Sequence, residues 1–405
     1  MNVMMIAPGY PDEMPFFVRG LALEGAQVIG IGDQPEHDVP NLTARHLASY
    51  IRVPSLQDED ECMRVVMQWA RGKKIDRVIC LWEPGVILAA KLREQLGAQG
   101  MSIEDTEAFR DKDLMKEKVG KAGIRVPMHK SAKSAQGVRA AVKKIGYPVI
   151  VKPIAGAGSM DTYRVDNAGQ LKEVIGKLGH IDRVNVEEFI DGEEYTYDTI
   201  CIDGKIVYAN IGYYRPRPLI ARSEEWISPQ TLCLRDLDAP ELKGGHEMGH
   251  AVIEALKFKT GFTHMEWYRK ADGEVVFGEI AARPAGARTV DLMNFVSDID
   301  LFRGYAEAEV KGTFSQVGPR KYNTVNIFKR AKGTGRIQRV EGLDSILYRF
   351  RPHIVNIDLL PIGAPRRNWV QTLVSDGYVT IRHPDFQAAM DIADAVGTDL
   401  TMYAG

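Results

Sequence analysis

Two glutamates, Glu266 and Glu279, are the residues of this sequence whose spacing points most directly to chemistry. They lie in two β-prone runs on either side of Asp272-Gly273, a pair that favours two-residue hairpin turns. If that pair forms the turn, the two carboxylates face each other across the hairpin. Like charges directly opposite each other destabilise a pair of β-strands. A divalent cation bound by both carboxylates would remove this repulsion and make the pair a metal site, and hard oxygen ligands suit Mg²⁺. Two solvated surface glutamates are the alternative.

A lysine followed by small residues suggests a phosphate site farther upstream. Lys152 ends an apolar run, and Gly156, Gly158 and Ser159 follow it. A lysine at the end of a buried strand is costly unless it reaches the surface or meets an anion. The glycines allow backbone N–H groups to approach phosphate oxygens, and Ser159 adds a hydroxyl. The lysine precedes the glycines, so this is not a Walker A sequence, and a plain turn is the alternative.

Residues 1–105 alternate strand and helix patterns, which predicts a parallel sheet of Rossmann-like topology. The predicted strands are 2–7, 27–32 and 76–82, and the predicted helices are 16–24, 60–71 and 84–96. The first loop contains no G-x-G-x-x-G, so dinucleotide binding gains little support. Glu83 follows the strand 76–82 at its carboxyl end, where such sheets place functional residues. It is a candidate substrate contact, with a helix N-terminal acid as the alternative.

The pattern changes at residue 106. The predicted elements are a lysine-bearing helix that ends at Gly123, strands at 147–153 and 183–190, a hairpin that turns at Asp203-Gly204, and helices at 168–178 and 244–256. Short strands and turns alternate from about residue 313, and a helix covers 385–396. We therefore predict three domains, at residues 1–105, 106–312 and 313–405.

The order of these features resembles the ATP-grasp superfamily of carboxylate–amine ligases, which includes the D-alanine–D-alanine ligases, the L-amino-acid ligases and biotin carboxylase. A lysine in an early helix is followed by the strand-Lys-Pro-glycine loop, then by Glu-Glu-Phe-Ile-x-Gly-x-Glu, and then by a carboxylate hairpin reading Glu-x-x-x-Arg. The resemblance covers residues 106–310 motif by motif and both flanks more weakly. It implies an α/β and α+β fold: a Rossmann-like N-terminal domain, an ATP-grasp domain and a C-terminal mixed subdomain.

The resemblance also implies roles for individual residues. Nucleotide phosphates would meet two lysines and the small-residue loop, and the adenosine would meet the acidic segment; the ATP-binding residues are then Lys112, Lys152, Gly156, Gly158, Ser159, Glu187, Glu188, Ile190 and Glu194. Glu187 would lie near the adenine amino group, and Glu194 would hold the ribose hydroxyls. Glu266 and Glu279 would carry Mg²⁺, for which Mn²⁺ can substitute, and Arg283 would stabilise the transition state.

One position departs from the family pattern. The third metal ligand of the family is usually an Asn two residues after the second Glu, and Ala281 occupies that position here. Mg²⁺ readily keeps several waters, so a water could take the place. The hairpin register puts His264 opposite Ala281, which leaves three roles open for this histidine: a metal ligand, a structural residue, or a contact to the acceptor substrate. The number of bound metals stays open.

Three arginines are further substrate candidates. Tyr213–Arg217 is a basic and aromatic segment, and Arg215 or Arg217 could meet a carboxylate substrate or an acyl phosphate, with a solvated loop as the alternative. Arg288 joins Glu83 and His264 among the candidate substrate residues.

The resemblance implies an ADP-forming ligase that makes a carbon–nitrogen bond through an acyl phosphate, with a small-molecule carboxylate and amine, such as amino acids, as substrates. Two alternatives are kept. The chain could be a carboxylase-type enzyme that uses bicarbonate, although it contains no biotin-bearing Met-Lys-Met. It could also be a non-catalytic ATP-binding sensor or scaffold, a reading that Ala281 keeps open.

The composition limits the other classes of protein. The 405 residues include 52 Lys+Arg and 54 Asp+Glu, a formal net charge of −2, so no basic surplus suggests nucleic acid. The four cysteines are far apart, which favours reduced thiols in a cytoplasmic protein. We read no signal peptide and no apolar run of membrane-spanning length. The sequence therefore predicts a cytoplasmic globular protein without nucleic-acid or membrane partners, and it leaves a homodimer open.

Overall fold

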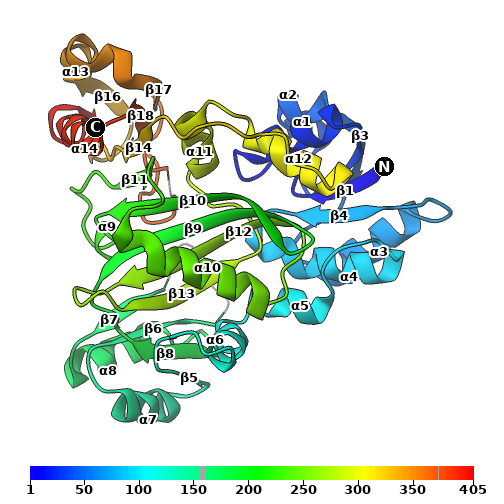
Figure 1. Ribbon diagram of the computed structural model, residues 1–405, viewed down its shortest axis with the longest axis horizontal. Helices are drawn as coiled ribbons and strands as arrows, with labels where there is room; N and C mark the ends of the chain where they lie inside the picture. The colour runs from blue at the N-terminus through cyan, green and yellow to red at the C-terminus, as the bar shows by residue number, and fades with distance from the viewer. Residues whose placement is uncertain (155–160, 373) are drawn as a thin grey trace.

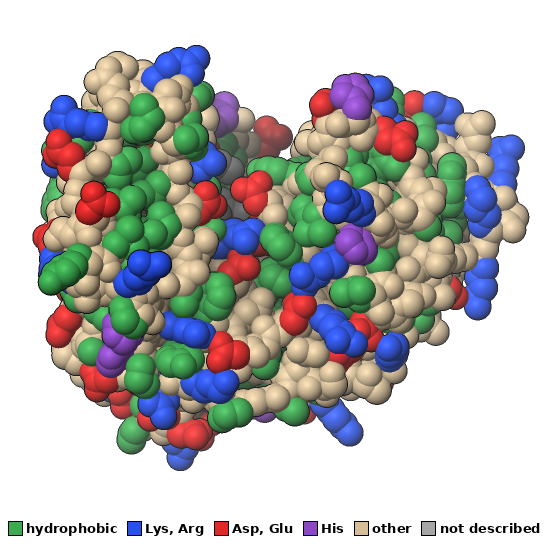
Figure 2. All heavy atoms as spheres, turned by 90° about the horizontal axis from the view of Figure 1, so that it is seen from above, with side chains coloured by type: hydrophobic (Ala, Val, Ile, Leu, Met, Phe, Trp, Pro, Cys, Tyr) green, Lys and Arg blue, Asp and Glu red, His purple; other side chains and the backbone are tan. Residues whose placement is uncertain are grey.

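The computed structural model describes residues 1–154, 161–372 and 374–405. Its strands form four sheets, one parallel and three wholly or mainly antiparallel, with helices packed against them (Figure 1). This mixed architecture confirms the predicted fold class. Seen from above, the molecule has two lobes separated by a hollow, with C-terminal elements on the left and the N-terminal sheet on the right (Figure 2). No helix of the described residues is both long and apolar enough to cross a lipid bilayer.

The N-terminal sheet is parallel, and its strand order is β3-β2-β1-β4. The strands are β1 (Asn2–Ile6), β2 (Gln27–Gly32), β3 (Leu47–Arg52) and β4 (Arg77–Cys80), and the helices are α1 (Met14–Leu23), α2 (Asn41–Ala44), α3 (Glu59–Trp69), α4 (Val86–Leu96) and α5 (Ile103–Glu107). The chain moves outward from β1 to β3 and then crosses to the other side of β1. Ligands of such sheets bind outside the carboxyl ends of the strands, at this switch in direction. The sequence analysis did not predict β3, in which Ile51 is the one buried residue.

A four-stranded antiparallel sheet follows, with strand order β5-β8-β6-β7. Its elements are α6 (Lys112–Lys121), β5 (His129–Ala132), α7 (Ala135–Ile145), β6 (Val149–Pro153), β7 (Tyr163–Val165), α8 (Ala168–Lys177) and β8 (Val184–Glu188). The valines of β6 and β8 pack on α7 and α8 in one apolar core. Because side chains alternate along a strand, Lys152 and Glu187 point to the opposite face, where α6 lies.

The largest sheet has eight strands in the order β13-β12-β9-β10-β11-β14-β18-β17, all antiparallel to their neighbours. Its strands are β9 (Glu193–Ile202), β10 (Lys205–Arg215), β11 (Gln230–Cys233), β12 (Gly261–Arg269), β13 (Val275–Ala281), β14 (Asn323–Phe328), β17 (Ile354–Leu359) and β18 (Gly377–His383). Strands from both sides of the predicted boundary at residues 312 and 313 share this sheet, and the three domain limits stay a prediction.

The remaining elements cover the large sheet or join it to its neighbours. The helices are α9 (Pro218–Ala221), α10 (Lys243–Ala255), α11 (Thr289–Ser297), α12 (Leu301–Lys311), α13 (Leu343–Phe350) and α14 (Phe386–Asp399), and a small sheet contains β15 (Lys332–Gly333), β16 (Ile337–Glu341) and β19 (Thr401–Ala404). Helix α12 packs against α1, so apolar side chains of the N-terminal sheet and of the large sheet belong to one core.

The β12–β13 hairpin has the predicted partners but not the predicted turn. Glu266 lies opposite Glu279, and His264 lies opposite Ala281, as expected. The prediction of a two-residue turn is wrong. The N–H of Lys270 donates a hydrogen bond to the backbone oxygen of Glu274 at 2.9 Å, so the loop has three residues. The last of them, Gly273, has a φ of +87°. The third loop residue shifts the register of β12 against β13 by one residue, and a bulge at Gly278 restores the predicted register for the residues beyond it. The other predicted turn, Asp203-Gly204, does have two residues with positive φ.

Candidate active site

Glu279 lies beside lysines from two other elements. Lys112, at the start of α6, places Nζ 3.2 Å from Glu279 Oε2, and Lys152, at the end of β6, places Nζ 3.5 Å from the same oxygen. Lys152 Nζ is also 2.7 Å from Glu187 Oε1, and Lys116 Nζ is 3.1 Å from Glu187 Oε2. We call these five residues the lysine–glutamate cluster. It holds three ammonium groups against two carboxylates, between the four-stranded sheet and the hairpin.

The local sequence fixes α6 against the four-stranded sheet and so positions the lysines. Asp111 caps the helix, because its side chain accepts hydrogen bonds from Asp113 N at 2.9 Å and from Leu114 N at 3.0 Å. Arg183, just before β8, then bonds Asp111 and Asp113 at 2.8 Å each. The lysines at the first and fifth positions of this helix lie on one face, one turn apart.

Burial and opposite charge set the protonation states of the cluster. Burial alone would raise the pKa of Glu187, but Lys116 and Lys152 lower it to about 2. Burial would also raise the pKa of Glu279, but the three lysines hold this pKa well below its usual range. The carboxylates in turn raise the pKa of Lys152 above its usual value, against the effect of burial. Lys116 is 0% exposed, and burial lowers the pKa of its ammonium group.

Several polar atoms on this face are buried without a hydrogen-bond partner among the described residues. They are Oδ1 and Nδ2 of Asn185 and, apart from the 3.1 Å ion pair that these two atoms form with each other, Lys116 Nζ and Glu187 Oε2. Asn185 is the cross-strand partner of Lys152, so it lies on the same face of the sheet. Buried polar groups are normally paired, and each unpaired one calls for an explanation. A polar ligand between the sheets would supply the partners.

The residues predicted to hold adenosine lie next to this cluster. Glu194 is only 5% exposed, and Arg217 places Nε 3.4 Å from its Oε2. Burial and the nearby Glu266 raise the pKa of Glu194. Arg217 also donates to the backbone oxygen of Ile190 at 3.0 Å. The side chain of Glu188 points away, because it binds Arg125 at 2.8 Å, and this leaves only its backbone for the predicted role.

Glu83 and Arg283 form an ion pair that joins the N-terminal sheet to the hairpin strand β13. Arg283 donates to Glu83 Oε2 from Nε at 2.8 Å and from Nη2 at 2.6 Å, and its Nη1 donates to Pro284 O at 2.8 Å. Arg110 binds the other oxygen of Glu83. Glu83 therefore lies beyond the carboxyl end of β4, as predicted, and it meets two guanidinium groups there.

The other substrate candidates fall into two groups. His264 is near the carboxylate hairpin: its Nδ1 lies 2.6 Å from Asp198 Oδ1 and its Nε2 3.7 Å from Glu266 Oε1. Burial lowers the pKa of His264, but these two carboxylates raise it, and the result is about 9.

Arg215 and Arg288 bind elsewhere. Arg215 contacts Asp394 of α14 at 3.1 Å rather than the cluster, and it is the last residue of β10, so the alternative of a solvated loop does not describe it. Arg288 contacts Asp291 at 2.8 Å at the start of α11. Gly156, Gly158 and Ser159 lie outside the described residues.

The sequence analysis did not select Lys116 or Arg110. Lys116 carried a usable signal, because it follows Lys112 by one helical turn on the face that becomes buried. Arg110 carried none, since its partner Glu83 is far away in the sequence.

The two opposed glutamates fit a magnesium ion that nucleotide phosphates help to hold. Mg²⁺ commonly uses one or two protein carboxylates together with waters and substrate phosphates. Within the described ranges, no group of three or more His, Cys, Asp or Glu side chains is arranged to hold a metal by itself. Glu266 and Glu279 would therefore be the protein's contribution.

The chain matches known proteins in sequence and in fold. Residues 145–291 match the family model described as ATP-grasp domain. The chain is 29% identical over 218 residues to an L-arginine-specific L-amino acid ligase of Bacillus subtilis, an alignment that covers 52% of each chain. It is 26% identical over 267 residues to alanine–anticapsin ligase of Bacillus subtilis (strain 168), covering 60% of this chain and 56% of that one. The alignments thus span about half the length of these curated relatives.

Solved structures extend the likeness in fold to the whole chain. An L-amino acid ligase from Bacillus licheniformis superposes with a TM-score of 0.81 at 20% identity, over 100% of this chain and 98% of that one. N5-carboxyaminoimidazole ribonucleotide synthetase from Thermotoga maritima superposes with a TM-score of 0.74 at 17% identity, over 100% and 99%. At these identities the superpositions establish the fold alone.

Proposed function

We propose that this chain, which belongs to the ATP-grasp superfamily through the domain at residues 145–291, is an ADP-forming carboxylate–amine ligase. The observation that carries the proposal is the lysine–glutamate cluster, where three ammonium groups converge between two sheets. A polyphosphate is the class of anion whose charge and oxygen acceptors suit such a convergence. The names of the relatives, L-arginine-specific L-amino acid ligase and alanine–anticapsin ligase, support amino acids as the substrates.

ATP would bind by exchanging partners within the cluster. In the structure the lysines are neutralised by Glu187 and Glu279. Phosphate oxygens would replace the carboxylates as partners of Lys112 and Lys152. This would free Glu279 to join Glu266 at a magnesium ion, which when bound supplies positive charge to the transferring phosphoryl group.

The nucleoside would lie along β8 and β9, where the acidic segment is. Glu194 would accept hydrogen bonds from the ribose hydroxyls, and the backbone around Ile190 would meet the adenine edge. The position of Arg217 between these two groups suits this arrangement, because its guanidinium already binds both. The side-chain atoms of Asn185, which have no hydrogen-bond partner among the described residues, lie on the same side of the sheet.

The reaction would take place in two displacements. A substrate carboxylate oxygen attacks the γ-phosphorus, the bond to the β-phosphate oxygen breaks, and ADP leaves. The amine nitrogen then attacks the acyl carbon of the acyl phosphate and loses a proton. The carbon–oxygen bond breaks, and phosphate leaves with the former carboxylate oxygen and that proton. Arg283 would donate to the oxygen that gains charge in the second step.

Oxygen transfer from the acid to phosphate tests this proposal. Amino acids labelled with ¹⁸O in the carboxylate are supplied in pairs with ATP and Mg²⁺, and ADP, phosphate and dipeptide are measured. We expect phosphate release that requires both an acid and an amine, and one ¹⁸O atom in each phosphate released. The Lys152→Met variant is the inactive control.

The alternatives give other results. ADP formation with bicarbonate and without any amino acid would indicate a carboxylase. ATP binding without ADP formation from any pair would indicate a sensor or scaffold. Phosphate without ¹⁸O would overturn the acyl-phosphate route.

A further inference from the structure

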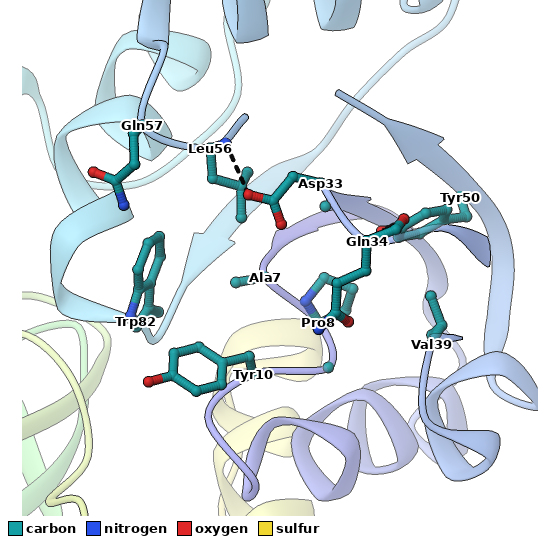
Figure 3. A pocket seen from close by; sticks show the side chains of 12 residues that line it. Ala7, Pro8, Tyr10, Asp33, Gln34, Val39, Tyr50, Leu56, Gln57 and Trp82 are labelled. Atoms are coloured by element: carbon teal, nitrogen blue, oxygen red, sulfur yellow. Dashed lines mark hydrogen bonds between the residues drawn. The ribbon is translucent and has the colours of Figure 1, made fainter. Parts of the chain in front are cut away.

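A cavity of about 270 Å³ lies in the N-terminal sheet, outside the lysine–glutamate cluster (Figure 3). The segments that follow β1, β2, β3 and β4 all contribute to its wall. It therefore lies at the carboxyl edge of the parallel sheet, where the direction of the strand order changes and where sheets of this type bind ligands. None of the roles derived above uses it.

The chemistry of the wall favours a cation. Among the described residues that line the cavity, Asp33 is the one with a carboxyl group, and none is Lys, Arg or His. One oxygen of Asp33 accepts a hydrogen bond from Leu56 N at 3.2 Å, and Figure 3 shows the other directed toward the cavity. With a carboxylate and no cationic side chain in its described wall, such a site attracts positive charge.

Aromatic rings complete the wall. Trp82 and Tyr10 lie at one side, with their ring centroids 6.1 Å apart and their planes at 75°. Tyr50 lies at another and is fixed by its hydroxyl, which donates to Gln34 O at 2.9 Å. The face of an aromatic ring attracts guanidinium and ammonium groups, and this attraction adds to that of a carboxylate.

The volume of the cavity suits an amino-acid side chain better than a whole nucleotide. Sites for drug-sized ligands run from roughly 300 to 1,000 Å³, so this cavity falls just below the range. It suits one long side chain. Tyr10 is 55% exposed and Asp33 is also exposed, so the mouth is open.

A residue of the cavity wall is adjacent in the sequence to a residue of the proposed reaction centre. Trp82 lines the cavity, and the next residue, Glu83, binds Arg283 at 2.6 Å. A substrate whose reacting group lies at Arg283 could therefore extend its side chain past Trp82 toward Asp33.

We propose that this cavity binds the cationic side chain of an amino-acid substrate, with a guanidinium or ammonium group held by Asp33 and the rings of Trp82 and Tyr10. The inference rests on the ligase function proposed above and names one of its substrate classes. It makes Asp33 a specificity-determining residue that touches the side chain and not the reacting atoms.

The Asp33→Asn variant tests the inference. The amide oxygen of Asn can still accept the hydrogen bond from Leu56 N–H, so the loop is kept and only the charge is lost. Asp38→Asn is the matched control, since Asp38 is a nearby exposed acid outside the cavity wall. The substrates are arginine and its uncharged analogue citrulline, compared by turnover and by calorimetry with the ATP-loaded protein.

We expect Asp33→Asn to lower the preference for arginine over citrulline about tenfold, through KM rather than kcat, and Asp38→Asn to leave it within about twofold. Equal binding of arginine and citrulline by the parent protein would overturn the inference, and so would equal effects of the two variants. If no amino-acid pair releases phosphate, the ligase function fails, but calorimetry still shows whether the cavity selects a cation.

Discussion

Replacing Arg283 by alanine separates a catalytic role from a structural one. The substitution could affect stability as well as turnover, because two nitrogens of the guanidinium bind Glu83 and the third binds a backbone oxygen. The side chains of Arg283 and Glu83 are 18% and 10% exposed, so this is a largely buried pair. Removing one partner of a buried pair costs about 3–5 kcal/mol. Arg110 stays bound to the other oxygen of Glu83, so we expect less, about 1–3 kcal/mol of unfolding free energy.

The loss in turnover should be larger than this loss in stability can explain. Removing one donor to a developing oxyanion lowers turnover by roughly a hundredfold to a thousandfold. Nucleotide affinity should barely change, because the predicted adenosine and phosphate contacts lie on other elements. Turnover is therefore measured per folded molecule, beside denaturant unfolding and calorimetric binding of ATP, on one preparation.

Arg110→Ala is the matched control for this measurement. Arg110 binds the same carboxylate and is similarly buried, at 16% exposed, but it binds Oε1 of Glu83, whereas Arg283 binds Oε2. It should lose comparable stability and keep most of its turnover per folded molecule. Equal losses of turnover in the two variants, or near-normal turnover in Arg283→Ala, would refute the catalytic role and leave Arg283 as a residue that holds the N-terminal sheet to the hairpin.

Three further predictions follow from the cluster and the hairpin. Lys152→Met should lower ATP affinity by at least about a hundredfold in calorimetry and also lower the melting temperature, because this lysine neutralises two carboxylates; parent-like ATP binding would contradict the phosphate role. Glu187 has its pKa lowered from 4.5 to about 2, so its contribution of roughly 3 kcal/mol is fully present above pH 4.5 and is lost as the pH falls toward 2. The unfolding free energy of Glu187→Gln should fall less than that of the parent protein as the pH is lowered over that interval. Parallel plots of unfolding free energy against pH for the two proteins would contradict the pairing. Gly278→Ala should cost more than about 1 kcal/mol, since a Cβ there lies 2.8 Å from the backbone oxygen of Glu266, whereas Gly176→Ala, with open space around its Cβ, should be neutral or stabilising.

The β12–β13 hairpin shows which parts of the strand register could be predicted from the sequence and which could not. The facing of Glu266 and Glu279 was predicted from a two-residue turn that the structure does not have. The extra loop residue and the bulge at Gly278 shift the register in opposite directions, so the prediction was right for the two glutamates and wrong for the residues nearer the turn. A bulge is set by contacts across the ladder, which a turn dipeptide does not encode.

The partners of the charged residues were beyond sequence reasoning. The motif order identified Lys112, Lys152, Glu187 and Glu279 as chemistry-bearing residues, but it gave no sign that they neutralise one another. Such pairs depend on how two sheets and a helix pack. The same holds for Glu83, which was selected from its place after a strand and whose two arginine partners come from elsewhere in the fold.

Under the proposed function, the unequal surroundings of the two hairpin glutamates would connect metal binding to nucleotide binding. Glu279 is held by lysines, whereas the shortest ion-pair distance of Glu266 within the described part of the chain is 3.7 Å, to His264. A magnesium ion that binds both carboxylates must compete with the lysines for Glu279. Phosphates that take over those lysines remove the competition, and the ion in turn compensates the phosphate charge. Under the proposed function, each ligand would therefore lower the cost of binding the other, and this reciprocal coupling would follow from the pairing of charges in the cluster.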